Sequence, residues 1–459
     1  GSGPLPQHRG PERRVILPSK VSESMAPAES KRLVGRKIAA VACFDSFGKL
    51  AMTMLAACRR EGAETTLLLL ELNNRALSRR QRLEIRRIDP KIRIEKHNWN
   101  QLRQLCGAMA GNVDALILGL DGQRSRDALL QLKTIWADQD QRPRLISAYP
   151  GILFRFGLEG MMDRSGADLL CLNSADDLAL YDRGRKALGL DSSNAVVTGL
   201  PILWQTKPRT SAIETPSIVF FEQPSIPVHP LQRRFLCDQI KELAAAWPDH
   251  PVIFKPRTSS IESTLHRRHG EMASVIDKMT REQPNLRLSF KPATRLLRQC
   301  GCAITVSSTA AMESMAMGIS TRIVGDLGVT ETLGNHFFAS SGAIATFAAI
   351  KANPFDVIHD AQWLEQQGLQ RDGENRFITA LVDRLNSPAT PLGASSHGPL
   401  SWGSSAWQKA ALRNGGRRML SSGGARSSQR KRHRTRRVLR SMRDGVVGFG
   451  WLSKLLRER

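Results

Sequence analysis

Three hydroxyl side chains stand together between an apolar run and a helix-like run in the stretch ITVSSTAAMESMAMG. Ser307, Ser308 and Thr309 follow the apolar run, and the spacing of the residues after them predicts a helix. The start of a helix leaves backbone N–H groups without partners and carries partial positive charge, which suits a phosphate, and short hydroxyls add donors there. A helix cap with Glu313 as the capping-box partner is the alternative interpretation. The position of the cluster leaves both open.

A second group of side chains that could bind an anion follows the predicted strand PVIFK. Lys255 and Arg257 flank a proline that ends the strand, and His266 follows in a predicted loop with further Arg and His residues. An Arg can fork onto two phosphate oxygens, whereas a Lys acts as a point charge. These residues could therefore hold a diphosphate or the ribose of a nucleotide. A solvated basic loop is the alternative, and the high charge of the chain favours it.

Two series of alternating strands and helices must position these groups. In the first series, apolar strand runs such as Lys37–Phe44 and Val113–Leu118 are followed by residues at helical spacing, which predict a helix over Gly48–Arg60 after the first run. Arg144–Ser147 is a further predicted strand of this series. The second series begins at the apolar run Ser217–Phe221 and includes a late predicted helix at Glu374–Asn386. Strands that are apolar on both faces and alternate with helices form a parallel sheet covered on both sides. We therefore predict an α/β protein with two doubly wound, Rossmann-like domains that face each other across a cleft.

The composition also predicts where the domains begin and end. Residues 36–205 are expected to form the first domain and residues 216–386 the second, because the pattern breaks into Gly, Pro and polar residues between them. Residues 1–35 show no periodic pattern and are predicted to be disordered. Residues 387–459 form a Ser/Gly/Pro-rich linker and a basic tail. In such sheets ligands bind outside the carboxyl ends of the strands, which is where the chemistry is expected.

The charge of the chain favours acidic partners. The net charge is +25, and residues 411–459 alone hold 15 Lys and Arg against 2 Asp and Glu. Such an excess attracts nucleotides, anionic lipid surfaces or nucleic acid. Residues 430–459 combine basic with aromatic and aliphatic side chains, as in a segment that lies on an anionic membrane. Nucleic acid is the weaker candidate because no reading module is recognisable, and a solvated, disordered tail is the alternative.

The remaining composition argues against several other classes of protein. The seven cysteines form no CxxC pair and no ligand-spaced cluster with histidines, which predicts reduced thiols and no metal site. No apolar run approaches the roughly 18 residues that a membrane helix needs. Motifs for P-loop hydrolysis, dinucleotide binding and serine hydrolysis are missing. We expect a cytoplasmic protein that is at most peripheral at the inner face of the membrane.

These residues resemble a known group of enzymes. The basic strand-end motif followed by SST is similar to the C-terminal half of GT-B glycosyltransferases, particularly the CMP-sugar-using sialyl- and polysialyltransferases and the CDP-glycerol glycerophosphotransferases. CFDSFGKLA, YPG, GLP and KPR followed by TLH resemble a bacterial family of GT-B-type glycosyltransferases over about residues 36–385. The sialyltransferase pattern expects His-Pro beside the strand, whereas here Arg257 follows the proline and His266 comes nine residues later. The donor nucleotide therefore stays open, with UDP and GDP beside CMP.

The resemblance implies roles for individual residues. The residues that it implies for donor and phosphate binding are Lys255, Arg257, His266, Ser307, Ser308 and Thr309. Gln223, after the strand SIVFF, lies where a loop of GT-B enzymes approaches the donor. An acceptor hydroxyl also needs a general base, and Asp45 and Asp121 at predicted strand ends are the candidates. Asp45 ranks ahead because it stands in the stretch most like the family, although either residue can instead form a turn or cap a helix.

The predicted function is transfer of a sugar from a nucleotide-activated donor, with CMP as one candidate nucleotide, to a cell-surface glycan or its precursor. The first domain would bind this glycan or lipid-linked acceptor and the second the donor. No metal or cofactor is expected, because helix dipoles and cationic side chains can stabilise the departing phosphate. Two alternatives stay open: a CDP-polyol phosphotransferase, and a non-catalytic α/β protein whose basic tail binds membrane or RNA.

Overall fold

The structure is a computed structural model of the chain. It describes residues 31–72, 76–136, 141–153, 157–223, 225–257, 272–356, 359–369 and 372–389. The predictions for residues 1–30, for His266 and for the basic tail lie outside these residues. Residues 31–35 were predicted to be disordered, and this is wrong, because Leu33 is buried in the core of the first domain.

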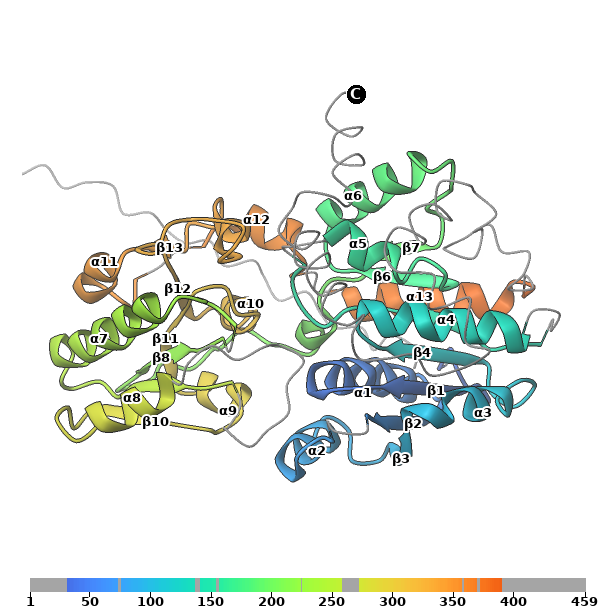
Figure 1. Ribbon diagram of the computed structural model, residues 1–459, viewed down its shortest axis with the longest axis horizontal. Helices are drawn as coiled ribbons and strands as arrows, with labels where there is room; N and C mark the ends of the chain where they lie inside the picture. Colours follow the sequence, from blue (N-terminus) through green and yellow to red (C-terminus); the bar gives the residue numbers. More distant parts are fainter. Residues whose placement is uncertain are drawn as a thin grey trace, which may run out of the picture.

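The first domain is built on a seven-stranded parallel sheet in the order β3-β2-β1-β4-β5-β6-β7 (Figure 1). Its strands are β1 (Lys37–Ala42), β2 (Glu64–Glu71), β3 (Arg93–Asn98), β4 (Ala115–Gly119), β5 (Arg144–Ser147), β6 (Leu169–Leu172) and β7 (Ala195–Val197). Every residue of β4, β5 and β6 is buried, as expected for strands covered on both faces. The strand order reverses between β1 and β4, which leaves a crevice at the carboxyl edge of these strands.

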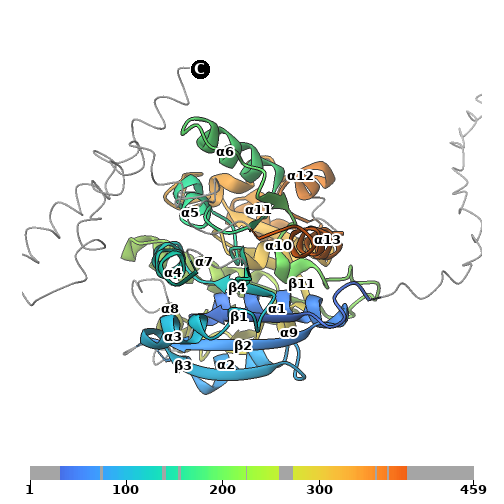
Figure 2. The same ribbon diagram turned by 90° about the vertical axis from the view of Figure 1, so that its right-hand side faces the viewer.

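Helices cover both faces of this sheet. They are α1 (Asp45–Arg60), α2 (Arg79–Arg86), α3 (Leu102–Gly107), α4 (Gly122–Trp136), α5 (Gly157–Met162) and α6 (Ala175–Lys186). Figure 2 shows α3 and α4 on one side of the sheet and α1 on the other, together with the late helix α13 (Gly373–Asn386). The buried residues between these layers form one continuous core.

The second domain repeats the same plan. Its six-stranded parallel sheet has the order β10-β9-β8-β11-β12-β13 and reverses between β8 and β11. The strands are β8 (Ser217–Phe221), β9 (Val252–Lys255), β10 (Leu286–Leu288), β11 (Cys300–Thr305), β12 (Ser320–Val324) and β13 (Ile344–Ala345). The helices are α7 (Pro230–Ala246), α8 (Met272–Met279), α9 (Ala293–Leu297), α10 (Ala310–Ala316), α11 (Phe347–Ala352) and α12 (Ala361–Gln366). The predicted pair of Rossmann-like α/β domains is confirmed.

The segment between the domains is anchored in both of them. The 3₁₀ helix η2 (Pro201–Leu203) places Leu203 in a core with Met312 of α10. The next residue, Trp204, packs in the core of the first domain, where its ring stacks on Phe377 at a centroid distance of 5.3 Å. Neighbouring residues of the linker therefore fix the two domains to each other.

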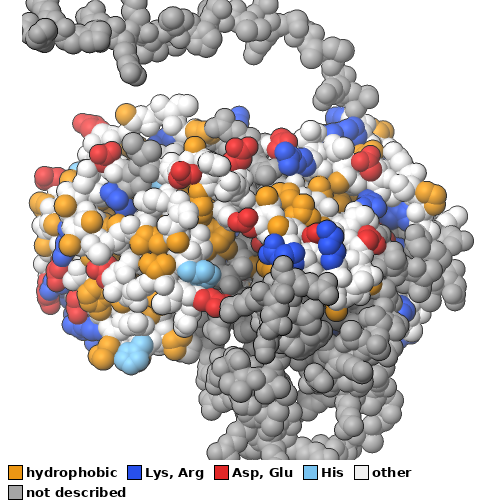
Figure 3. All heavy atoms as spheres, turned by 90° about the horizontal axis from the view of Figure 1, so that it is seen from above, with side chains coloured by type: hydrophobic (Ala, Val, Ile, Leu, Met, Phe, Trp, Pro, Cys, Tyr) orange, Lys and Arg blue, Asp and Glu red, His pale blue; other side chains and the backbone are white. Residues whose placement is uncertain are grey.

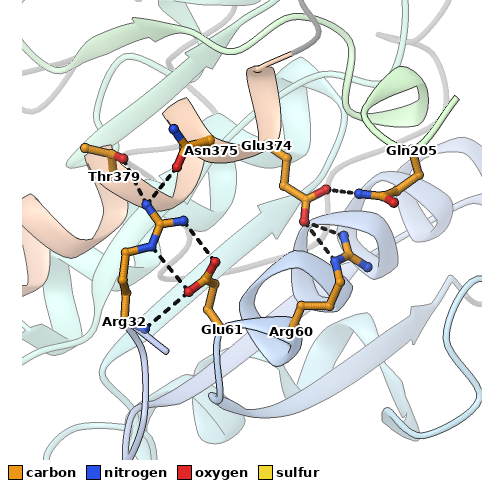
Figure 4. A network of polar contacts seen from close by, with 7 residues as sticks. All are labelled: Arg32, Arg60, Glu61, Gln205, Glu374, Asn375 and Thr379. Atoms are coloured by element: carbon orange, nitrogen blue, oxygen red, sulfur yellow. Dashed lines mark hydrogen bonds and ion pairs between the residues drawn. The ribbon is translucent and has the colours of Figure 1, made fainter. Parts of the chain in front are cut away.

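The helix α13 departs from the expected domain boundary. The prediction assigned residues up to 386 to the second domain, but α13 packs on the first, with Phe377, Ile378 and Leu381 in its core. Figure 4 shows how the helix is held: Glu374 accepts hydrogen bonds from Arg60 at the end of α1 and from Gln205 of the linker. The helical spacing of apolar residues predicted the helix correctly, but this spacing does not specify which core the helix joins.

The first helix begins earlier than the sequence suggested. We expected it from Gly48, whereas α1 starts at Asp45, directly after Phe44, whose φ of 65° turns the chain sharply out of β1. Gly48 lies inside the helix, and a Cβ there would stand 2.6 Å from the side chain of Ile85 in α2. This glycine therefore allows α2 to pack closely on α1.

Within the described residues, no helix is long and apolar enough to cross a bilayer. Figure 3 views the molecule from above, where acidic, basic and hydrophobic side chains are interspersed over the described atoms of both domains.

Candidate functional site

A cleft between the two domains collects the carboxyl ends of strands from both sheets. Its empty volume is about 980 Å³. The first domain contributes the start of α1 and part of α2, and the second domain contributes residues at and just after the carboxyl ends of β8, β9 and β11. The lining residues include Asp45, Lys49, Arg80, Glu84, Pro150, Ile202, Glu222, Lys255, Arg257, Ser308, Thr309 and Glu313. The cleft therefore holds several of the predicted site residues.

Two of the three hydroxyl residues, Ser308 and Thr309, line this cleft. The hydroxyl of Ser308 accepts a hydrogen bond of 3.3 Å from the backbone of Ala310. Thr309 is the N-cap of α10 and makes no side-chain cap bond. The Thr309 hydroxyl lies against Gly151 of the YPG motif, where a Cβ would stand only 2.9 Å away. A capping box with Glu313 is therefore not the role of this cluster.

Ser307 and Gln223 have a supporting position instead. Ser307 is buried, and its hydroxyl donates to the carbonyl of Leu333 at 2.5 Å. Its backbone N–H donates to Oε1 of Gln223 at 2.8 Å, and Nε2 of Gln223 donates to the Ser307 hydroxyl at 3.2 Å. Neither residue lines the cleft. The structure does not bring these two predicted donor-binding residues into the cleft, and their bonds instead fix the loop that carries Ser308.

The basic pair at the end of β9 does line the cleft. Lys255 is 7% exposed, and its Nζ donates to the carbonyl of Pro256 at 2.8 Å. Burial lowers the pKa of Lys255 to about 8, and nearby cations, first among them Arg80, act in the same direction. An anion in the cleft would offset this burial by pairing with the ammonium group. Arg257 follows the proline and adds a second cation beside it.

The first domain faces these groups with a chain of alternating charges. Nζ of Lys49 lies 3.1 Å from Asp45 and 2.6 Å from Glu84, which in turn pairs with Arg80 at 2.5 Å. Burial lowers the pKa of Lys49, but the two carboxylates outweigh it and the pKa is raised. Asp45 also has a buried oxygen, Oδ1, with no hydrogen-bond partner among the described residues. These three charged residues, Lys49, Glu84 and Arg80, were not predicted from the sequence, although the i,i+4 spacing of Arg80 and Glu84 is a recognisable pairing signal.

Asp121 is not brought into the cleft. Its Oδ1 accepts from the backbone N–H of Arg124 at 3.2 Å, and its Oδ2 pairs with the Arg124 guanidinium at 2.6 Å. Asp121 lies directly before α4 (Gly122–Trp136) and caps the N-terminus of this helix. The geometry thus favours Asp45 over Asp121 as the candidate base.

Glu313 also lines the cleft, whereas the sequence suggested only a capping role for it. It lies in the first turn of α10, four residues after Thr309 and hence on the same side of the helix. Burial raises its pKa to about 7, against the opposing effect of the cations Lys49, Arg257 and Lys255. This spacing from Thr309 is the signal that could have identified it. Its carboxyl group can accept hydrogen bonds from ligand hydroxyls or exchange a proton near neutral pH.

Metal ligands do not gather in the part of the chain that the structure describes. There, no group of three or more His, Cys, Asp or Glu side chains is arranged to hold a metal ion. All seven cysteines are buried free thiols.

Comparison with known proteins adds a family and a fold. The family described as "Putative glycosyltransferase (DUF6716)" matches residues 38–384. MnaA of S. aureus, solved with UDP, is 12% identical with a TM-score of 0.53 over 76% of this chain and 97% of that protein. The UDP-GlcNAc 2-epimerase of Neisseria meningitidis, bound to UDP-GlcNAc, is 12% identical with a TM-score of 0.52 over 76% of this chain and 100% of that one. At this identity the two structures establish a shared fold. Among curated proteins, none matches the sequence significantly.

Proposed function

The chain belongs to this family of glycosyltransferases, and from that membership we propose that it transfers a sugar from a nucleotide-activated donor to a hydroxyl of a cell-surface glycan or its precursor. The observation that carries the proposal is the convergence of two cations and two hydroxyls from one domain with a carboxylate from the other in a single cleft. These residues are Lys255, Arg257, Ser308, Thr309 and Asp45.

The second domain would bind the donor. Lys255 and Arg257 are placed to pair with phosphate oxygens, and the hydroxyls of Ser308 and Thr309 can donate to the same oxygens. Because α10 has only seven residues, this proposal relies on the cations and hydroxyls and not on the helix dipole. Glu313 could accept hydrogen bonds from hydroxyls of the donor.

The first domain would supply the base. In the proposed reaction an acceptor hydroxyl forms a bond to the anomeric carbon, the bond from that carbon to the donor phosphate breaks, and Asp45 takes the hydroxyl proton. The nucleotide leaves with the bonding electron pair, and Lys255 and Arg257 stabilise the charge that develops on its phosphate. These cations provide the charge that a metal ion provides in other transferases, so we propose transfer without a metal.

A nucleotide panel tests the donor site. CMP, CDP, UDP and GDP are compared by thermal shift, and one of them should stabilise the protein, by about 2.7 kcal/mol at a hundredfold excess over Kd. UDP enters the panel because the two solved structures contain it or its sugar conjugate, and CMP because of the sialyltransferase likeness. Ser308→Ala and Lys255→Ala should remove the shift, while Lys278→Ala, an exposed lysine on α8, should retain it. Equal shifts by all four nucleotides, or unchanged shifts in both site variants, would overturn the proposal.

The same panel separates binding from chemistry. Asp45→Asn should retain the shift by the selected nucleotide but lose most of the turnover, about 100-fold or more, because general-base catalysis contributes on that scale. Turnover is measured as release of that nucleotide from its sugar conjugates. Asp121→Asn is the matched control, since this carboxylate lies outside the cleft lining.

A further inference from the structure

A second groove continues from the cleft between α1 and α2 of the first domain and α9 of the second. Its empty volume is about 1760 Å³. In Figure 1 these helices lie on the facing sides of the two domains. The groove shares Lys49, Glu84, Glu313, Ile202, Pro292 and Ala293 with the cleft. A ligand in the groove could therefore reach the residues that face the proposed donor.

Arginines from both domains line this groove. Arg87 follows α2, and Arg295 and Arg298 lie on and just after α9. All three are exposed, and among the described residues none of them makes an ion pair. Arg60 also lines the groove, but it pairs with Glu374 at 2.6 Å, as Figure 4 shows. Three guanidinium groups are thus available for an anion, and such groups bind phosphate oxygens in pairs.

Apolar side chains line the same groove as these arginines. Ile88 is 39% exposed and Ile202 is 37% exposed, and both line the groove. Large hydrophobic side chains with such exposure are few in the described chain, and two of them line this groove. Ala56, Pro201, Pro292 and Ala293 also line the groove. The groove therefore combines an apolar wall with free cations.

We infer that this groove is the acceptor site and that it takes a lipid-linked acceptor with a phosphate-type anion next to an apolar chain. The arginines would hold the anion, the isoleucines would contact the chain, and the sugar or hydroxyl end would point toward Asp45. This inference rests on the proposed glycosyl transfer and specifies its acceptor class. A water-soluble anionic glycan would use the arginines but not the apolar wall.

The test uses the chain of residues 1–459 saturated with the nucleotide that the panel selects, so that the donor site is filled. Farnesyl diphosphate, farnesol and inorganic diphosphate are titrated by calorimetry. Farnesyl diphosphate should bind at least about tenfold more tightly than either of the other two, a difference of about 1.4 kcal/mol. The double variant Arg295→Ala/Arg298→Ala should lose about tenfold in affinity for it, while the Kd of the nucleotide stays unchanged. Arg281→Ala/Arg287→Ala removes two exposed arginines outside the groove and should bind like the wild type.

Ile88→Ser tests the apolar wall, because this substitution should lower the affinity for farnesyl diphosphate and leave the affinity for inorganic diphosphate unchanged. Equal affinity for farnesyl diphosphate and inorganic diphosphate would overturn the lipid assignment, and equal affinity for farnesyl diphosphate and farnesol would overturn the anion site. Failure of the wild type to bind any nucleotide would instead overturn the proposed function itself. The two failures are therefore distinguishable.

Discussion

Glu313 and Lys255 have pKa values that move toward neutrality from opposite sides for one physical reason. Burial disfavours the charged form of each, so the pKa of the carboxyl rises to about 7 and that of the ammonium falls to about 8. Both residues line the same cleft. Groups with such shifts in one cleft are typical of functional sites, because proton transfer is most efficient when the pKa lies near the working pH.

Replacing Glu313 should make stability less dependent on pH. The folded pKa of about 7 lies above the ordinary value of 4.5, so folding favours the protonated carboxyl. The contribution of the Glu313 carboxyl to the free energy of unfolding is fully present below pH 4.5 and is lost as the pH rises through 7. As the pH rises from about 4.5 to about 7, the stability of Glu313→Gln should therefore come to exceed that of the wild type, by up to about 3 kcal/mol. Urea unfolding across this range measures the difference.

The control for this measurement is Glu331→Gln, which removes an exposed carboxylate outside the cleft. A stability difference between Glu313→Gln and the wild type that is the same at about pH 4 and about pH 8 would show that Glu313 does not change its protonation on folding.

At the scale of elements, continuous apolar runs were the most predictable feature. The strands β5 (Arg144–Ser147) and β8 (Ser217–Phe221) have the predicted bounds, because strands buried on both faces are apolar at every position. The helices α5, α11 and α12 have six residues each and were not predicted, since so few residues show no clear period. The bounds of α1 were missed because they depend on the unusual backbone of Phe44.

The candidate site was predictable where it depends on strand ends. Lys255 ends a predicted strand, Ser308 and Asp45 follow predicted strands, and the carboxyl ends of parallel strands meet at one edge of a sheet. The partners Lys49 and Glu84 could not be foreseen, because their contact depends on how two helices pack. The direction of a loop side chain cannot be read from the sequence pattern, so the burial of Ser307 could not be predicted.

The helix α13 should contribute strongly to the stability of the first domain. Phe377→Ala removes a fully buried ring that stacks on Trp204, which should cost about 3–5 kcal/mol. Because the helix belongs to the core of the first domain, this loss of stability should be confined to that domain. Amide hydrogens in α1 and β6 should therefore exchange earlier than those in β8 and β9. Hydrogen exchange followed by mass spectrometry resolves these segments.

A matched variant on the same helix is Arg376→Ala, which removes an exposed ion pair with Asp372 and should cost no more than about 0.5 kcal/mol. Exchange that increases first in β8 and β9 after Phe377→Ala would contradict the assignment of this helix to the first domain.

The basic charge is concentrated in residues 411–459, whereas the two folded domains lie before residue 390. The described face in Figure 3 mixes both signs of charge, whereas residues 411–459 hold 15 Lys and Arg against 2 Asp and Glu. The two domains are joined through Leu203 and Trp204, which lie in different cores. Nucleotide binding is therefore expected to depend on the domains, and attraction to a membrane on the tail.

Removal of the tail should separate these two properties. A variant that ends at residue 389 loses the basic and aromatic residues of the segment 430–459 and should no longer sediment with vesicles that contain phosphatidylglycerol. Each Lys or Arg near an anionic surface contributes about 1 kcal/mol, so the full chain should bind these vesicles, and added salt should weaken that binding. The thermal shift by the selected nucleotide should be the same in both chains, since the lining of the cleft ends at Glu313. Equal vesicle binding by the two chains would place the membrane contact on the domains, where the groove lined by Arg295 and Ile88 would be the first surface to test.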